Sequence, residues 1–179
     1  MSKMKKYVIT GGPNSGKTSI VGLLAEVGFS VLHETSRMVI ETKKIMPWDN
    51  QELFCEEFLK MQLSREAELS GDAAVFLDRS LVDPVAYAEL AGCRIRQTVA
   101  DDIVRARYER TVFFFEMLPS YCTDTQRGES HEQARLVHQK LREVYARLGF
   151  AIVEVPLFSL NAVESKKMRL QFILQQVAK

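Results

Sequence analysis

The stretch Gly-Gly-Pro-Asn-Ser-Gly-Lys-Thr at residues 11–18 decides the expected fold, because it matches the pattern G-x-x-x-x-G-K-[ST]. An apolar run at residues 7–9 precedes it, and an amphipathic stretch over about residues 17–27 follows it. A strand, a glycine-rich loop and a helix in this order form a phosphate-binding unit, in which glycines let successive N–H groups turn toward phosphate oxygens. The stretch therefore predicts a site for the phosphates of a nucleotide.

Several residues of this loop have an expected chemical role. The Lys17 ammonium would lie near the β- and γ-phosphates, and the Thr18 hydroxyl would ligate Mg²⁺. The alternative is a glycine turn before a helix whose lysine is merely solvated, but average residue frequencies make a chance match rare. The expected nucleotide-binding residues are Gly11, Gly12, Pro13, Asn14, Ser15, Gly16, Lys17, Thr18 and Ser19.

Short apolar runs alternate with helical patterns along the rest of the chain. Strands are expected near residues 7–9, 29–32, 73–77, 112–115 and 151–155, and helices near 17–27, 35–45, 49–69, 82–90, 99–108, 131–148 and 162–177. This alternation is typical of a parallel sheet covered on both faces. We expect an α/β fold of the P-loop NTPase type: a three-layer sandwich with a five-stranded, mostly parallel sheet. The length of 179 residues favours a single domain over 1–179.

Composition excludes several other classes of function. The net charge of +1 creates no bulk field that would draw the chain to nucleic acid or to an anionic membrane. No apolar run approaches the roughly 20 residues that span a bilayer. The three cysteines are widely spaced and contain no CxxC pair, so we expect reduced thiols and a cytoplasmic location. A small ligand is the expected partner, and a homodimer is possible.

An aspartate and an arginine follow the third expected strand. Asp78 resembles the carboxylate that holds Mg²⁺ beside such a phosphate loop, and its alternative role is a helix N-cap. Arg79 is a candidate for binding substrate or phosphate, because its planar guanidinium matches an anion; a surface ion pair is the alternative. Ligands of such sheets bind beyond the carboxyl ends of the strands, where both residues are expected.

A glutamate follows the second expected strand. The Glu34 carboxylate could accept the proton of an attacking hydroxyl at the γ-phosphate, or it could simply favour the start of the next helix. Arg37 lies one turn further along, and the sequence leaves open whether it faces the same pocket or solvent.

The polar stretch 118–130 is a candidate lid between the fourth strand and a long helix. Arg127 in this segment could neutralise charge on the transferred phosphoryl group, although a solvated loop would have a similar composition.

The motifs taken in order resemble a known family. They are GGPNSGKT at 11–18, HETSR at 33–37, FLDRSLVDPVAYAELAG at 76–92, DTQRGE at 124–129 and LGFAIVEVP at 148–156. Together they are similar to small AAA-type P-loop ATPase or kinase domains related to the nicotinamide riboside kinase domain of the bacterial NAD regulator, and more distantly to thymidylate and deoxynucleoside kinases. The resemblance covers nearly the whole chain.

The resemblance implies a role for each candidate residue. Glu34 would act as the base, Asp78 with Arg79 would serve Mg²⁺ and substrate, and the lid residue Arg127 would contact phosphates. The lid lacks the dense arginine set of typical nucleoside monophosphate kinases.

Two functions follow from these residues. The leading hypothesis is transfer of the γ-phosphoryl group of Mg-ATP to a hydroxyl of a small nucleoside-like substrate. The alternative is a nucleotide-dependent regulatory ATPase or GTPase switch that acts on a protein partner. The loop reads phosphates and not the base, so GTP is possible, but the sequence has no N-K-x-D guanine signature and ATP is favoured.

Overall fold

The computed structural model describes residues 4–71, 74–119 and 130–178. In these residues the strands are β1 (Lys6–Thr10), β2 (Ser30–Leu32), β3 (Val75–Asp78), β4 (Tyr108–Phe115) and β5 (Ala151–Val155). The helices are α1 (Lys17–Glu26), α2 (Thr35–Lys43), α3 (Gln51–Ala67), α4 (Asp83–Ala91), α5 (Val99–Ala106), α6 (His131–Arg147) and α7 (Ala162–Val177).

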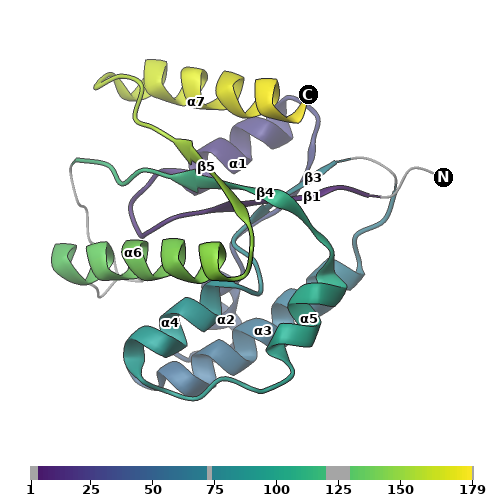
Figure 1. Ribbon diagram of the computed structural model, residues 1–179, viewed down its shortest axis with the longest axis vertical. Helices are drawn as coiled ribbons and strands as arrows, with labels where there is room; N and C mark the ends of the chain where they lie inside the picture. The colour runs from purple at the N-terminus through teal and green to yellow at the C-terminus, as the bar shows by residue number, and fades with distance from the viewer. Residues whose placement is uncertain (1–3, 72–73, 120–129, 179) are drawn as a thin grey trace.

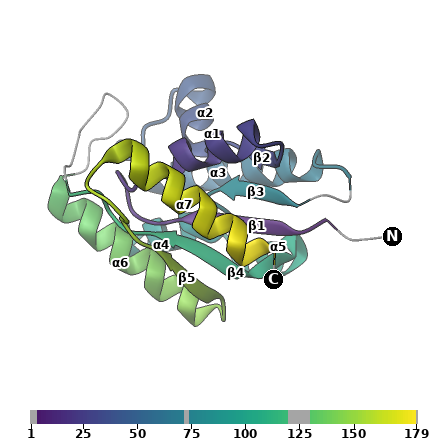
Figure 2. The same cartoon turned by 90° about the horizontal axis from the view of Figure 1, so that it is seen from above.

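The strands form one parallel sheet (Figure 1). Their order across the sheet is β2-β3-β1-β4-β5. Helices α1 and α7 cover one face of the sheet, and α6 and α4 lie on the opposite side. Figure 2 looks onto the face that α1 and α7 cover. This arrangement confirms the α/β, P-loop NTPase expectation. Because β1 is central, its carboxyl end lies between the ends of β3 and β4. No helix in the described ranges is long and apolar enough to cross a membrane.

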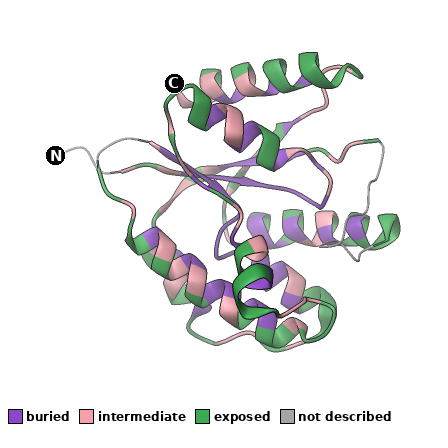
Figure 3. Cartoon of the chain, turned by 180° about the vertical axis from the view of Figure 1, so that it is seen from behind, coloured by how far each residue is buried: buried purple, intermediate pink, exposed green. Residues whose placement is uncertain are grey.

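The second half of β4 shows why the strands have continuous apolar sequences. Phe113 and Phe115 pack with α1 and α7, whereas Val112 and Phe114 pack against α6 on the other face. All four side chains are fully buried. Successive side chains of a strand point to opposite faces, so a strand covered on both sides must be apolar at every position. Figure 3 shows the resulting layer of buried strands between helices with exposed outer surfaces.

The start of β4 differs from the sequence expectation. A helix was expected to reach about residue 108, but α5 ends at Ala106 and β4 begins at Tyr108. Arg107 between them has a left-handed backbone with φ 55°, which stops the helix. The Tyr108 hydroxyl donates to Glu66 at 2.6 Å and accepts from the Leu81 N–H at 3.2 Å. Polar contacts hold this end of the strand, and apolar periodicity therefore does not reveal it.

We expect Leu77→Ala to lower the free energy of unfolding by about 2–5 kcal/mol, because Leu77 is fully buried in the sheet and its truncation leaves a cavity. Leu136→Ala on α6 is the matched control, since Leu136 is 46% exposed and its loss should change stability by about 0.5 kcal/mol or less. Urea denaturation of both variants tests this. Equal losses would mean that Leu77 does not lie in the core.

Candidate functional site

The loop between β1 and α1 has the backbone that its glycines predict. Gly11 has a φ of 133°, and a Cβ atom there would lie 2.6 Å from the backbone oxygen of Phe115. Gly16 precedes α1 with a φ of 80°, and none of the described side chains caps the helix. The first N–H groups of a helix lack partners within the helix and attract anions. The loop therefore presents donors where phosphate oxygens would bind.

Lys17 extends back along this loop. Its ammonium donates hydrogen bonds to the Gly11 and Gly12 backbone oxygens at 3.0 and 2.8 Å and to Ser15 Oγ at 3.0 Å. Burial, and next the charge of Arg79, lower the pKa of Lys17 to about 8. The side chain still carries a positive charge at neutral pH, so it can pair with a phosphate.

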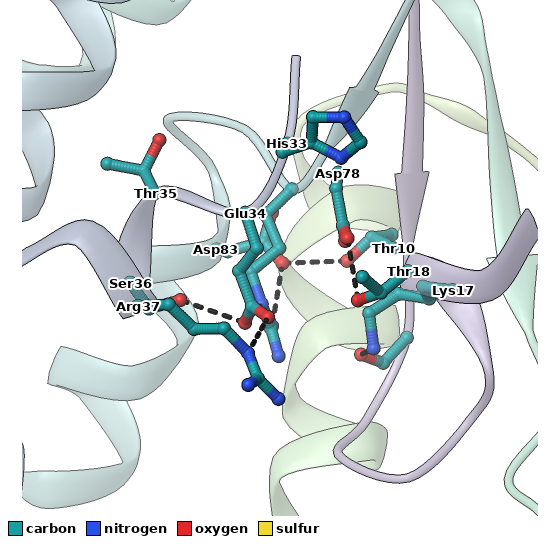
Figure 4. Close-up of polar contacts among 12 residues, drawn as sticks. Thr10, Lys17, Thr18, His33, Glu34, Thr35, Ser36, Arg37, Asp78 and Asp83 are labelled. Atoms are coloured by element: carbon teal, nitrogen blue, oxygen red, sulfur yellow. Dashed lines mark hydrogen bonds and ion pairs between the residues drawn. The ribbon is translucent and has the colours of Figure 1, made fainter. Parts of the chain in front are cut away.

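Thr18 and Asp78 meet beside the loop (Figure 4). Thr18 Oγ1 donates to Asp78 Oδ2 at 2.8 Å. Asp78 Oδ1 is buried and accepts no hydrogen bond from the described residues. Burial, and next the nearby Glu34, raise the pKa of Asp78 to about 6. A hydroxyl and a carboxylate with a spare oxygen fit Mg²⁺, which is usually held by one or two protein ligands together with phosphates and water.

Glu34 lies in a group of cations and hydroxyls. Its Oε1 accepts from Arg79 Nε at 2.9 Å and from Ser36 Oγ at 2.9 Å, and its Oε2 lies 3.5 Å from Arg37 Nε (Figure 4). Burial alone would raise the pKa of Glu34, but the charges of Arg79 and Lys17 outweigh it and lower the pKa to about 2. Glu34 is thus a stable carboxylate, and Arg37 faces the pocket.

Arg79 is buried and adopts a left-handed backbone with a φ of 77°. Such a conformation costs a non-glycine residue roughly 1–3 kcal/mol and persists only where the surroundings enforce it. Here the Arg79 N–H donates to the Ile9 oxygen at 3.0 Å, and its guanidinium pairs with Glu34 and lies 5.7 Å from the centre of the Tyr87 ring. The strained backbone places the guanidinium inside the site.

Asp83 is a second partner of Arg79, at 3.3 Å, and it links three parts of the fold. Its carboxylate accepts from Thr10 Oγ1 at 2.8 Å, from the Ser80 N–H at 2.9 Å and from the Tyr145 hydroxyl at 2.7 Å. The end of β1, the start of α4 and helix α6 are therefore tied to one buried carboxylate.

A cavity of about 290 Å³ joins these groups. The loop residues Pro13, Asn14, Ser15, Gly16, Lys17, Thr18 and Ser19 line one side of it. Polar residues Glu34, Ser36, Arg37, Arg79 and Asp83 also line it. An apolar wall completes it and consists mainly of Ile40, Pro47, Phe54, Phe58, Pro84 and Tyr87. We use the name acceptor compartment for the part of the cavity that this wall and the polar residues just named line together. The phosphate loop and a second, largely apolar space are thus continuous.

The structure brings together the sequence-predicted residues Lys17, Thr18, Glu34, Asp78 and Arg79. Gly11 and Gly12 hold the Lys17 ammonium, and the remaining loop residues line the cavity. Arg127 and most of the predicted lid, residues 120–129, lie outside the described residues, so that role stays a prediction.

Two positions that sequence reasoning did not single out hold the loop from behind. Arg169 of α7 is buried and donates to the backbone oxygens of Ser15 at 2.7 Å, Pro156 at 2.9 Å and Glu116 at 3.3 Å. His138 Nδ1 of α6 accepts the Gly12 N–H at 3.2 Å. The only sequence signal for Arg169 is its spacing of four residues from the buried Ser165 and Ile173, which places an arginine on the buried face of α7.

A parallel sheet of this order, with the G-x-x-x-x-G-K-[ST] loop between its central strand and a helix, defines a P-loop NTPase. A family model described as an AAA domain matches residues 6–162, and the chain belongs to this AAA domain family. A search of curated proteins found no match.

Solved structures share the fold at low sequence identity. The NadR protein in complex with NAD and AMP-PNP is 18% identical with a TM-score of 0.65, over 94% of this chain and 50% of that one. The chain thus spans about half the length of NadR. Thymidylate kinase from Ehrlichia chaffeensis is 12% identical, with a TM-score of 0.68 and coverage of 98% and 99%. Deoxyadenosine kinase from M. mycoides is 13% identical, with a TM-score of 0.58 and coverage of 97% and 98%. The fold is that of a small, kinase-like P-loop domain.

We expect Arg169→Met to weaken ADP binding about tenfold, because removing a charged donor from three backbone carbonyls, of which that of Ser15 is buried, costs about 1–3 kcal/mol and releases the loop. Calorimetric titration of ADP measures the effect. Arg135→Met on α6 is the matched control, since Arg135 is exposed. If a folded Arg169→Met variant bound ADP with unchanged affinity, the phosphate loop would be held in place without Arg169.

We expect His138 to make the protein less stable in mild acid. Burial, and next the charge of Arg142, lower the pKa of His138, so the unfolded chain binds this proton more readily than the folded chain. The stabilising contribution of neutral His138 to the folded state is therefore complete above about pH 6.5, the pKa of histidine in the unfolded chain, and it is lost as the pH falls below that value. The difference in melting temperature between the wild type and His138→Gln should narrow between about pH 8 and about pH 5. A constant difference would contradict this assignment.

Proposed function

We propose that the chain transfers the γ-phosphoryl group of Mg-ATP to a hydroxyl of a small, nucleoside-like substrate. The observation that carries the proposal is the continuity of the cavity, which joins the phosphate loop to Glu34, Arg79 and the apolar wall. A protein that only bound and hydrolysed a nucleotide would need the loop but not the second space. A phosphoryl transferase needs both, because donor and acceptor must lie in one site.

The loop and its neighbours would bind the nucleotide. The first N–H groups of α1 and the Lys17 ammonium would bind phosphate oxygens, and Lys17 would exchange its neutral acceptors for charged ones. Thr18 and Asp78 would hold Mg²⁺, which neutralises charge on the β- and γ-phosphates when it is bound. In the proposed site, the protein therefore contributes mainly position and positive charge.

Glu34 and Arg79 would orient the acceptor. The acceptor hydroxyl would donate to the Glu34 carboxylate, and its oxygen would form a bond to the γ-phosphorus while the bond to the β-phosphate oxygen breaks. The hydroxyl proton would pass to Glu34, and ADP would leave. A carboxylate with a pKa near 2 is a weak base, but in a loose transition state the proton is released late, after the hydroxyl has begun to bond to phosphorus. Glu34 would thus act mainly by orienting the hydroxyl.

The structural neighbours support the proposal by their names. NadR was solved with AMP-PNP, and both thymidylate kinase and deoxyadenosine kinase are named for phosphorylation of nucleotides or nucleosides. We further propose that the site prefers ATP to GTP. In the proposed mechanism, Arg127 of a lid segment would contact the phosphates.

We expect Glu34→Gln to lower the rate of acceptor-dependent ADP formation by about 100-fold or more, with the affinity for ATP little changed, because the neutral amide would neither orient the hydroxyl as the carboxylate does nor take its proton. The assay would use Mg-ATP with a panel of nucleosides, and Lys17→Ala would serve as the inactive blank. Glu41→Gln is the matched control, since Glu41 is exposed on the same stretch of chain.

An unchanged rate in Glu34→Gln would rule out its proposed role. A slow release of ADP that no nucleoside stimulates would instead favour the regulatory ATPase, and the search would turn to protein partners.

A further inference from the structure

The acceptor compartment has an aromatic wall. Phe54 and Phe58 of α3 are buried at the cavity, and Tyr87 of α4 also lines it, with its ring beside the Arg79 guanidinium. Apolar and aromatic walls with a few polar groups bind ligands that have a flat or apolar body. Gln51 is a neutral polar side chain in this wall and could pair with a polar edge of such a body.

Apart from Lys17 of the phosphate loop, the charged groups that line the described cavity are already paired with each other. Among the described residues that line it, Arg79 lies between Glu34 at 2.9 Å and Asp83 at 3.3 Å, and Arg37 lies 3.5 Å from Glu34. Two guanidinium groups therefore face two carboxylates. A dianionic phosphate could reach Arg79 only through guanidinium N–H groups that these two ion pairs do not use, and there it would lie close to both carboxylates and be repelled by them.

We infer that the acceptor compartment binds an uncharged alcohol with a flat, apolar body, and not an acceptor that already carries a phosphate. The inference rests on the proposed function and narrows its substrate class. A neutral hydroxyl can donate to Glu34 and accept from Arg79 without separating any ion pair. A phosphate group in the same place would lie against the Glu34 carboxylate, where like charges repel. Of the named neighbours, this charge pattern suits the acceptor of deoxyadenosine kinase and not that of thymidylate kinase.

The test compares each nucleoside with its own 5′-monophosphate. Thymidine, deoxyadenosine and their monophosphates would be titrated calorimetrically into the full chain with ADP and Mg²⁺ present. Binding is measured without turnover, so the result does not depend on catalysis. At least one nucleoside should bind about tenfold or more tightly than its monophosphate. Tighter binding of the monophosphates, or no binding of any of the four compounds, would overturn the inference.

Glu34→Gln tests the charge argument directly. The variant leaves Arg79 and Arg37 with one carboxylate fewer, so the affinity for a monophosphate relative to its nucleoside should rise about tenfold or more. Glu41→Gln should leave this ratio unchanged. If a folded Glu34→Gln variant kept the same ratio of monophosphate affinity to nucleoside affinity, charge pairing would not select the acceptor.

These results separate this inference from the proposed function. If a monophosphate both binds better and is phosphorylated, the chain is still a kinase but the acceptor class is wrong. If a nucleoside binds as expected and is never phosphorylated, the acceptor class is supported and the phosphoryl transfer fails.

Discussion

The buried guanidinium of Arg79, held between Glu34 and Asp83, is the interaction on which the rest of the site depends. A buried cation is tolerated only when it is paired and hydrogen-bonded, and each of its partners comes from a different part of the fold. Glu34 fixes the end of β2, and Asp83 fixes the start of α4 and reaches β1 and α6 through Thr10 and Tyr145. These contacts stabilise Arg79 in its left-handed backbone conformation, which would otherwise be unfavourable for a non-glycine residue.

The order of the sheet explains how these groups meet. Strand β1 is central, so the phosphate loop at its end lies beside the end of β3, where Asp78 and Arg79 follow. Strand β2 lies beyond β3 and delivers Glu34 to the same edge. The apolar residues on both faces of the strands hold this arrangement, and the polar residues of the site lie at or just after the carboxyl ends of the strands. Apolar packing thus positions the strands, and the residues at the strand ends supply the polar groups of the site.

The sequence predicted those parts of the site that lie next to a strong local pattern. Lys17 and Thr18 belong to a loop motif, and Glu34 and Asp78 each follow an apolar run, so their common edge could be expected from parallel topology alone. Arg169 could not be found in this way, because its contacts with Ser15, Pro156 and Glu116 join segments far apart in the chain. Likewise, the early start of β4 depends on a left-handed Arg107 and on tertiary hydrogen bonds of Tyr108, which leave no periodic signal.

The two carboxylates of the site have opposite electrostatic environments, and this difference assigns them different chemistry. Asp78 has a raised pKa, one oxygen without a hydrogen bond from the described residues, and a hydroxyl neighbour in Thr18. Glu34 has a lowered pKa because the charges of Arg79 and Lys17 outweigh the effect of its burial. Carboxylates whose pKa values are pushed apart by their surroundings commonly divide the work of a site. A cation would relieve the unfavourable burial of Asp78 but would gain little at Glu34, which is already neutralised. This contrast is the reason why we propose Mg²⁺ at Asp78 and the hydroxyl of an uncharged acceptor at Glu34.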